Sequence, residues 1–309
     1  MNVLLHGVTG NGTTDDTAAL QACLNAAAPT GETVYLPAVT SPTYPQVGGY
    51  RITAPLNVPN FVRITGDGMG TVLKGEHAGA IFQSPSINGL EWDHMAIRGL
   101  MCWGLKQTDP ANYTQRLHAH HLYFHRDLFR CIDGNLIVST IEDSSFGELG
   151  NAAQYHSHIV SQGSGGNQSN HNLVRRNRMF NATKWSVYFA DGYGVVLDGN
   201  NMEGNACAPV QIHGMFMSVI TNGHHERNVP RADQPQCEII YTNGNSANRV
   251  SIVERTWFNP HANVTHLADF SGAGAVRFRD ITSSSMGGKW LTNGQNAYVD
   301  TLSWGHWPQ

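Results

Sequence analysis

The sequence has little charge of either sign and no long apolar run. Asp, Glu, Lys and Arg make up only 14% of its 309 residues, and the formal net charge is −4. A protein that binds nucleic acid usually carries a basic patch, so this composition argues against a nucleic-acid partner. No stretch approaches the roughly 20 apolar residues of a membrane-spanning helix, and membrane insertion is therefore not expected.

Cysteine is scarce, and its spacing excludes the usual metal and redox motifs. The five cysteines are odd in number and include no CxxC pair. They are therefore predicted to be buried free thiols that pack as small apolar side chains. The first residues, MNVLLHG, also lack the basic segment and the apolar stretch of a secretory signal peptide, so no such signal is visible.

The stretch GNGTTDDTAALQACLNAA, at 10–27, predicts a short amphipathic helix. Apolar residues recur in it at helical spacing. Thr14, Asp15 or Asp16 can accept hydrogen bonds from the first N–H groups, and acidic side chains favour the positive end of the helix dipole. We therefore interpret Asp15 and Asp16 as structural residues of a capping segment at 1–30.

The rest of the chain, 31–309, is built from repeats. Six segments share one pattern of apolar and polar residues, and they begin at Ile141, Val174, Leu197, Ile220, Val253 and Val276. A second register of segments that end in glycine lies between them. Each repeat holds two or three short strands and no helix, so strands of successive repeats must pair in parallel. The sequence thus predicts an all-β fold, a right-handed parallel β-helix with a short N-terminal capping helix.

Two details of the interior follow from this fold. Asn177 and Asn200 are expected at bends, where their amides bond neighbouring backbone. Alternation along the strands predicts which side chains point inward in one sheet. That inward set is Tyr188, Ala190, Val210, Ile212, Ile240, Thr242, Ala268 and Phe270.

The opening sequence carries a family resemblance. GVTGNGTTDDTAALQACLNAA, followed by TVYLPA and YRI, resembles the start of the pectate-lyase-like β-helix superfamily, and most of all phage tailspike depolymerases. The resemblance implies a polysaccharide substrate, a homotrimer, and an extracellular location on a virion tail or as a secreted protein. The Asp-Asp signature of polygalacturonases and the Asp-Pro-His-Asp signature of mannuronan epimerases are absent, so the reaction type stays open.

Residues at equivalent positions of successive coils form outward columns, about 4.8 Å apart per coil. The residue before each glycine of the second register gives one such column: Asp133, Gln162, Asp191, His213, Asn243, Ser271 and Asn293. In it Asp191 and His213 are expected to be direct neighbours. Asp133 and Asp191 would lie about 9.6 Å apart, near the upper limit for an inverting glycosidase. Asp-Gly is also ordinary turn chemistry, which is the alternative interpretation.

A second column follows the bend and holds His125, Gly147, Phe180, Glu203, Glu226 and Asn259. Glu203 and Glu226 would lie one coil apart, close to the roughly 5 Å of a retaining glycosidase pair. The alternative is that these acids lie on a solvated face. Tyr241 and Trp257 lie beside the columns and either stack on sugar rings or pack in the core. A weaker acidic group, Glu142, Asp143 and Glu148, is expected to pair with Arg175 and Arg176.

Histidine is abundant, and HAHHLYFH places His118, His120, His121 and His125 close together. A metal site there is conceivable, but no second ligand group at a diagnostic spacing accompanies it, so none is expected. His213 is different, because a histidine in an acidic column can act as the base of a lyase.

These patterns predict a glycoside hydrolase of the tailspike type that degrades a bacterial surface polysaccharide. The expected catalytic residues are Asp191, Glu203, Glu226, His213 and Asp133, and the expected substrate-binding residues are Gln162, Asn243, Tyr241 and Trp257. No cofactor is expected. The first alternative is a polysaccharide lyase, which needs a cation or Ca²⁺ to neutralise a uronate. The second is a non-catalytic glycan-binding spike or adhesin.

Overall fold

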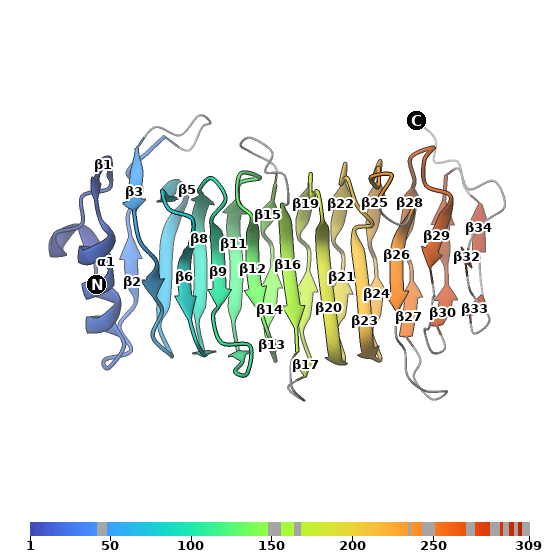
Figure 1. Cartoon of the computed structure of the whole chain (residues 1–309), viewed down its shortest axis with the longest axis horizontal. Helices are drawn as coiled ribbons and strands as arrows, with labels where there is room; N and C mark the ends of the chain where they lie inside the picture. The colour runs from blue at the N-terminus through green and yellow to red at the C-terminus, as the bar shows by residue number, and fades with distance from the viewer. Residues whose placement is uncertain are drawn as a thin grey trace.

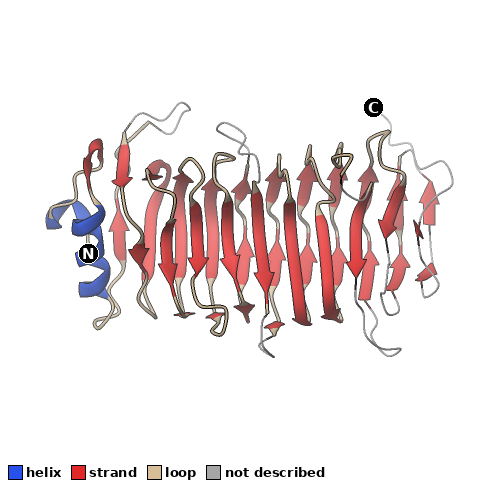
Figure 2. Cartoon of the chain, viewed as in Figure 1, coloured by secondary structure: helices blue, strands red, loops and turns tan. Residues whose placement is uncertain are grey.

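The protein is an elongated solenoid of about 8 turns, with its strands stacked along the long axis (Figure 1). The computed structural model describes residues 1–41, 48–147, 156–163, 168–233, 236–242, 251–269, 276–284, 291–292, 297–299 and 302–304. The predicted right-handed parallel β-helix is confirmed. In the described part of the chain the one α-helix lies at the N-terminal end (Figure 2).

The strands form two sheets, and neighbouring strands pair in parallel. The larger sheet has 20 described strands. They are β1 (Asn11–Asp15), β2 (Val34–Leu36), β3 (Gly49–Ile52), β5 (Arg63–Gly75), β8 (Glu91–Arg98), β11 (His118–Phe124), β14 (Thr140–Glu142), β15 (Ser145–Phe146), β18 (Leu173–Arg175), β19 (Arg178–Phe180), β21 (Val196–Asp198), β22 (Asn201–Glu203), β24 (Val219–Thr221), β25 (His224–Glu226), β27 (Ser251–Glu254), β28 (Trp257–Asn259), β30 (Val276–Arg279), β31 (Ile281–Ser283), β33 (Ala297–Val299) and β34 (Leu302–Trp304).

The smaller sheet has 14 described strands. They are β4 (Leu56–Asn57), β6 (Ala80–Ser84), β7 (Ile87–Asn88), β9 (Trp103–Gln107), β10 (Thr114–Gln115), β12 (Arg130–Gly134), β13 (Leu136–Ile137), β16 (Ser157–Gln162), β17 (Ser169–Asn170), β20 (Trp185–Tyr193), β23 (Val210–Phe216), β26 (Cys237–Thr242), β29 (His266–Asp269) and β32 (Leu291–Thr292). From β4 onward each coil contributes one or two strands to this sheet and then one or two strands to the larger sheet.

The N-terminal segment covers the first coil. It comprises a 3₁₀-helix, η1 (Val3–His6), the strand β1 and the helix α1 (Thr17–Ala27), whose apolar face is buried. The Asp15 carboxylate accepts hydrogen bonds from the Thr17 amide at 3.0 Å and the Thr53 hydroxyl at 2.6 Å. Hydrogen bonds from Thr17 and Thr53 lower the Asp15 pKa to about 2. The contacts of Asp15 are therefore those expected of a capping residue.

Asp16 is used differently from the expectation. It occupies the N-cap position of α1 but makes no side-chain bond to the helix. Instead its buried carboxylate accepts hydrogen bonds from the Thr9 amide at 2.7 Å and the Gly10 amide at 3.0 Å. Asp16 thus holds the loop before β1 rather than the helix.

The registers confirm most of the repeat frame. Ile141, Val174, Leu197, Ile220 and Val253 occupy equivalent positions in successive coils, as the sequence predicted. The last step was wrong by two residues, because Val253 pairs with Phe278 while Val276 pairs with Ser251.

The predicted asparagine ladder is present. The Asn177 side chain accepts a hydrogen bond from the Ser144 amide at 3.0 Å, and Asn200 accepts one from the Asn177 amide at 3.1 Å. A second ladder that the sequence analysis did not identify joins Asn205 to Asn228, since the Asn228 side chain accepts from the Asn205 amide at 3.0 Å. Both ladders satisfy backbone groups that the solenoid buries at its bends.

The inward set was only partly right. Val210, Ile212 and Ala268 belong to the main core, as expected. In two coils the true inward residues lie one position away from the predicted ones, at Val187, Phe189, Ile239 and Tyr241. Ile240 is buried outside the main core, with Ala208 and Cys237, and Tyr188 is only half-buried. Phe270 lies outside the described residues.

Candidate functional site

The second predicted column is formed from Phe180 to Asn259, whereas its first predicted member, His125, is buried. Phe180 in β19 pairs with Glu203 in β22, Glu203 with Glu226 in β25, and Glu226 with Asn259 in β28. Adjacent strands of a sheet lie about 4.8 Å apart. Glu203 and Glu226 are both half-buried, so the two carboxylates are stacked neighbours that remain accessible on the outer face.

The two glutamates have different surroundings. Glu226 is held by three neighbours: Asn259 Nδ2 donates to its Oε1 at 3.2 Å, His224 Nε2 lies 3.3 Å from its Oε2, and Arg227 Nε lies 3.4 Å from its Oε1. The Glu203 side chain makes no hydrogen bond or ion pair with the described residues. One carboxylate is therefore positioned and charge-compensated, and the other is free to interact with a ligand.

Trp257 lies beside this pair. Its ring contacts the His224 ring, with centroids 4.3 Å apart and planes tilted by 40°. Trp257 and His224 pair across β25 and β28, two residues before Asn259 and Glu226 on the same outward face. We call Glu203, His224, Glu226, Trp257 and Asn259 the glutamate–tryptophan face. Three of its members were predicted site residues, and the structure brings them together.

The first predicted column is formed only in part, because Gln162 and His213 share it and Asp133 and Asp191 do not. Asp133 pairs with Val160, and Val160 with Tyr188. Gln162 pairs with Ala190, and Ala190 with His213. The glycines that defined this column occupy different positions relative to their strands, because the connections between strands differ in length. Asp133 therefore does not share a column with Gln162 or with His213.

Asp191 pairs with neither Gln162 nor His213, because Ala190 occupies that position. Asp191 has a positive φ of 55°, at a bend within β20, and is exposed. Its Oδ1 lies against the backbone of Gly214, where an added Cβ would approach it to 2.7 Å. The predicted contact of Asp191 with His213 is therefore wrong, and His213 instead lies 2.7 Å from the Thr242 hydroxyl through Nδ1. Asn243 lies outside the described residues.

Tyr241 is not a sugar-stacking platform. Its side chain is only 4% exposed and belongs to the main core, where its hydroxyl accepts a hydrogen bond from Ser218 Oγ at 3.3 Å. The expectation failed because the inward and outward positions of β26 are reversed relative to the predicted alternation.

Asp133 lies in a different and richer environment on the outer face of the smaller sheet. Arg130 donates to Asp133 Oδ2 at 2.7 Å, and the Trp103 indole N–H donates to the same oxygen at 3.0 Å. Lys106 Nζ lies 4.2 Å from the centre of the Trp103 ring. The carboxylate thus fixes an arginine and a tryptophan side by side.

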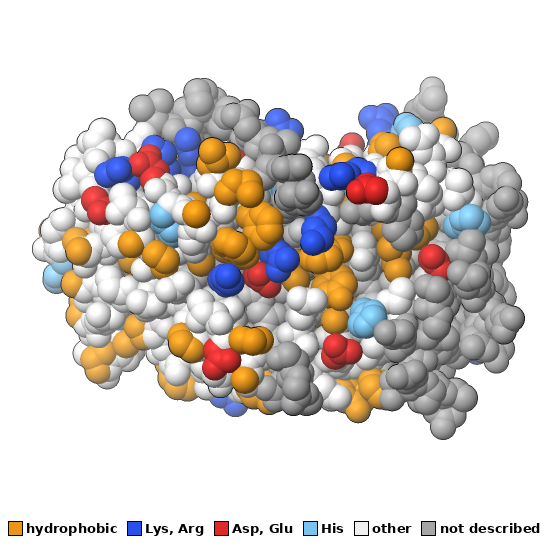
Figure 3. Space-filling model, viewed as in Figure 1, with side chains coloured by type: hydrophobic (Ala, Val, Ile, Leu, Met, Phe, Trp, Pro, Cys, Tyr) orange, Lys and Arg blue, Asp and Glu red, His pale blue; other side chains and the backbone are white. Residues whose placement is uncertain are grey.

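The same arrangement continues two coils further along this face. Lys184 Nζ lies 4.2 Å above the Trp185 ring, and the Arg130 guanidinium lies 5.5 Å from it. Burial and the charge of Arg130 lower the Lys184 pKa. We call Trp103, Lys106, Arg130, Asp133, Lys184 and Trp185 the tryptophan–cation face. Figure 3 shows cationic side chains among hydrophobic ones near the middle of this side of the molecule.

Aromatic rings beside cations are suited to carbohydrate chains that carry negative charge. The sequence analysis identified only Asp133 here. Three segments could have revealed this face: WGL from Trp103, RCI from Arg130 and WSV from Trp185. They begin equivalent strands, in which Trp103 pairs with Arg130 and Trp185 pairs with Ser157.

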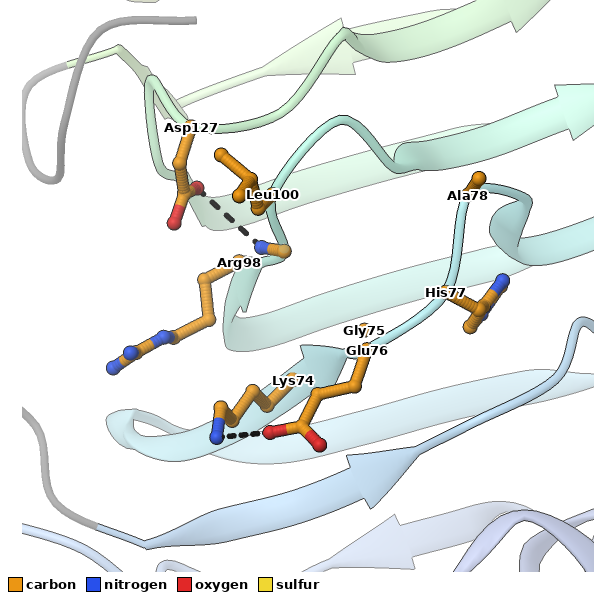
Figure 4. A pocket seen from close by; sticks show the side chains of 9 residues that line it. Lys74, Gly75, Glu76, His77, Ala78, Arg98, Leu100 and Asp127 are labelled. Atoms are coloured by element: carbon orange, nitrogen blue, oxygen red, sulfur yellow. Dashed lines mark hydrogen bonds and ion pairs between the residues drawn. The ribbon is translucent and has the colours of Figure 1, made fainter.

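A hollow of about 470 Å³ lies at the connections that lead into this sheet (Figure 4). Lys74, Glu76, Arg98 and Asp127 line it. Burial raises the Asp127 pKa, whereas hydrogen bonds from Lys74 and then Arg51 lower that of Glu76. Two carboxyl groups with opposite shifts and two cations therefore border one cavity, a combination that suits a polar or anionic ligand.

The third acidic group behaves as expected. Arg175 Nε lies 2.5 Å from Glu142 Oε2, and Arg176 bonds both Glu142 and Asp143. These acids are neutralised by their neighbours on the next coil. Glu148 lies outside the described residues.

The fold is a parallel β-helix, and its first part resembles a known family. A family model for rhamnogalacturonase A and epimerase, pectate lyase-like, matches residues 1–97. No curated protein matches the sequence. In the part of the chain that the structure describes, no helix is long and apolar enough to cross a membrane.

Solved structures share the fold along the whole chain. The tailspike protein of Acinetobacter phage vB_ApiP_P1 superposes with a TM-score of 0.77 and 17% identity, over 98% of this chain and 59% of the tailspike. The A-module of the Azotobacter vinelandii mannuronan C-5 epimerase AlgE6 gives 0.58 and 19%, over 100% of both chains. PfbA, a surface adhesin of Streptococcus pneumoniae, gives 0.60 and 10%, over 99% of this chain and 92% of PfbA.

These similarities concern architecture. The three proteins are a phage tailspike, an epimerase and an adhesin, so one backbone supports different activities. The present chain spans 59% of the tailspike's length. Its activity must therefore be argued from its own side chains.

Proposed function

We propose that this protein is a polysaccharide-degrading enzyme, a glycoside hydrolase that acts on a bacterial surface polysaccharide through Glu203 and Glu226. The observation that carries the proposal is the outward stacking of these two glutamates on adjacent strands, beside Trp257. The similarity to phage tailspike proteins and to a polysaccharide epimerase supports a carbohydrate substrate.

The different surroundings of the two glutamates assign their roles. Glu226, fixed by His224, Asn259 and Arg227, attacks the anomeric carbon as a carboxylate. Glu203, which has no cationic partner among the described residues, protonates the leaving oxygen and then activates the water that hydrolyses the intermediate. Glu203 and Glu226 lie one coil apart, which is close to the roughly 5–5.5 Å between the two carboxyl groups of retaining enzymes. We therefore expect retention of the anomeric configuration.

The other predicted site residues, three catalytic and one substrate-binding, take subsidiary places in this proposal. Asp133 orders the tryptophan–cation face, which we assign to binding of the polysaccharide chain. Asp191, His213 and Gln162 lie on the outer side of the same sheet and contact the chain further along. By analogy with tailspikes, we extend the proposal to an extracellular homotrimer.

The test is release of reducing ends from capsular, O-antigen and plant polysaccharides. Glu203→Gln and Glu226→Gln should each lower turnover at least a hundredfold with an unchanged circular dichroism spectrum, since acid–base catalysis is typically worth 10² to 10⁴. The matched control is Glu254→Gln, because Glu254 is also an outward glutamate but already pairs with Arg255 at 2.7 Å. Equal loss in all three variants would refute the assignment, and an unsaturated product that absorbs in the ultraviolet would identify a lyase.

A second candidate function is non-catalytic glycan binding, and the tryptophan–cation face favours it. Its rings and cations can hold a polysaccharide without any reaction. If the native protein binds a polysaccharide and releases no product, while Trp103→Ala and Trp185→Ala abolish binding, the adhesin interpretation replaces the hydrolase.

A further inference from the structure

A histidine cluster lies on the outer face of β8 and β11, away from both faces described above. These strands pair in parallel, with Glu91 beside His118 and Asp93 beside His120. His94 and His121 follow at the bend, each with a positive φ of 53°. The bend turns both side chains outward, so two consecutive coils present histidines to the same place.

Three of these rings converge. His120 Nδ1 and His121 Nδ1 are 2.9 Å apart. The His94 and His121 rings are stacked, with centroids 4.7 Å apart and planes at 4°. One nitrogen from each of His94, His120 and His121 lies within 4.8 Å of the other two. Nitrogens on one tetrahedral Zn²⁺ are separated by about 3.3 Å, given bonds of about 2.0–2.1 Å, so small side-chain rotations complete the geometry.

A buried carboxylate orients one of the rings. His94 Nδ1 lies 2.7 Å from Asp93 Oδ1, and the Asp93 side chain is fully buried. An imidazole that donates Nδ1–H to a carboxylate presents Nε2 as a metal ligand, which is the usual outer arrangement of histidine metal sites. Asp93 is itself held by Thr65 and by Arg63 at 3.2 Å.

Two carboxylates border the cluster. The fully buried Asp93 lies 3.7 Å from His120 Nε2 through Oδ2. His120 Nε2 is buried and makes no hydrogen bond with the described residues. Glu91 Oε1 adds a second carboxylate 3.6 Å from His120 Nε2.

We propose that His94, His120 and His121 bind one divalent transition-metal ion of the kind that prefers imidazole, such as Zn²⁺, Ni²⁺ or Co²⁺. Asp93 is a positioning residue for His94. Because the ligands come from two coils, the ion ties β8 to β11, and three imidazoles leave a fourth position for water or an external ligand. The sequence analysis expected no metal site, since the accompanying ligand, His94, lies one coil earlier in the chain.

A second group, Glu91, His118 and His120, shares one residue with this site. It fits less well, because His118 Nε2 already lies 2.8 Å from Glu142 Oε1. Variants at His94 and His118 therefore distinguish the two groups.

The experiment uses the full chain, stripped with EDTA, dialysed and titrated with Co²⁺ while the visible d–d absorption is recorded. We expect one ion per chain, displacement by Zn²⁺, and a rise in Tm on binding. His94→Ala and His121→Ala should each weaken binding at least about 10-fold, whereas His118→Ala and the exposed control His171→Ala should leave it unchanged. All variants are checked by circular dichroism before titration.

Three outcomes overturn the proposal: no saturable Co²⁺ absorption by the native chain, equal loss in the His171→Ala control, or loss in His118→Ala with binding retained in His94→Ala. The measurement does not depend on polysaccharide degradation, so it stands or fails separately from the proposed function.

Discussion

At the scale of single residues, neighbouring side chains of the same type have different structural roles. Asp15 and Asp16 are neighbours in sequence. The Asp15 side chain accepts hydrogen bonds from Thr17 in α1 and from Thr53, which follows β3. The Asp16 side chain is buried and accepts hydrogen bonds from the Thr9 and Gly10 amides. Glu203 and Glu226 occupy equivalent positions of successive coils, but only Glu226 is held by partners. Burial and neighbours, rather than residue type, set each role.

Replacement of Asp16 should therefore cost more stability than replacement of Asp15. Asp16→Ala leaves two backbone N–H groups without an acceptor, so we expect a loss of about 2–4 kcal/mol in the free energy of unfolding. Asp15→Ala removes an exposed capping contact and should cost about 1 kcal/mol. Urea unfolding measures both. Polysaccharide turnover should survive in each variant that remains folded, and its loss in Asp15→Ala alone would contradict the structural interpretation.

A related prediction concerns the asparagine ladder. Asn200 Nδ2 donates to the Val174 carbonyl at 2.8 Å, and its Oδ1 accepts from the Asn177 amide. Asn200→Ala should destabilise the chain by about 2–3 kcal/mol, because these buried groups lose their partners. Asn263→Ala is the control, since Asn263 is exposed. Similar unfolding curves for the two variants would show that the ladder contributes little.

At the scale of elements, β16 and the residues before it bring ionisable side chains inside the solenoid. His156 and His158 are fully buried near Phe146. The Leu128 carbonyl accepts a hydrogen bond from His156 Nδ1 at 2.8 Å. Burial lowers the pKa of His156 to about 4 and that of His158 well below its usual range. These rings are therefore neutral in the folded chain.

This burial predicts acid lability. In the unfolded chain the histidines bind protons near pH 6.5, whereas folded His156 does so only near pH 4, so stability is lost as the pH falls through this window. Each such histidine contributes a slope of up to about 1.4 kcal/mol per pH unit. Urea unfolding at pH 8, 7, 6 and 5 should show the decline.

The variant His156→Gln should reduce that slope, even if it lowers stability at pH 8, because one proton fewer is taken up on unfolding. His171→Gln, at an exposed position, should leave the slope unchanged. A pH dependence that is the same in both variants would assign the acid lability to other groups.

At the scale of the whole molecule, the solenoid exposes large apolar side chains along its connections. Phe61, Val138 and Met217 are 59%, 57% and 62% exposed. The tailspike similarity and these side chains together motivate the homotrimer proposed above. Light scattering at micromolar concentration should give three times the chain mass of 33.7 kDa. Val138→Asp with Met217→Asp should weaken the assembly, and a native chain that scatters as a monomer would contradict it.

The architecture was predictable because a repeated structural unit produces a repeated sequence pattern. Ile141, Val174, Leu197 and Ile220 mark equivalent positions at regular steps, and such periodicity admits few folds. The Glu203–Glu226 pair was predictable for the same reason, since each glutamate is the last residue of a three-residue strand in its coil.

Other features were decided only by the tertiary structure. Connections of unequal length shift the register between coils, so Asp133 and Gln162, each next to a glycine, do not lie in one column. In β26 a shift of one residue places Tyr241 inside the core. The tryptophan–cation face and the histidine cluster join residues about one coil apart, such as Trp103 with Arg130 and His94 with His121. Local sequence determines the strand and the bend, whereas the side chains that meet across coils depend on the exact residue count between them, which only the folded registers reveal.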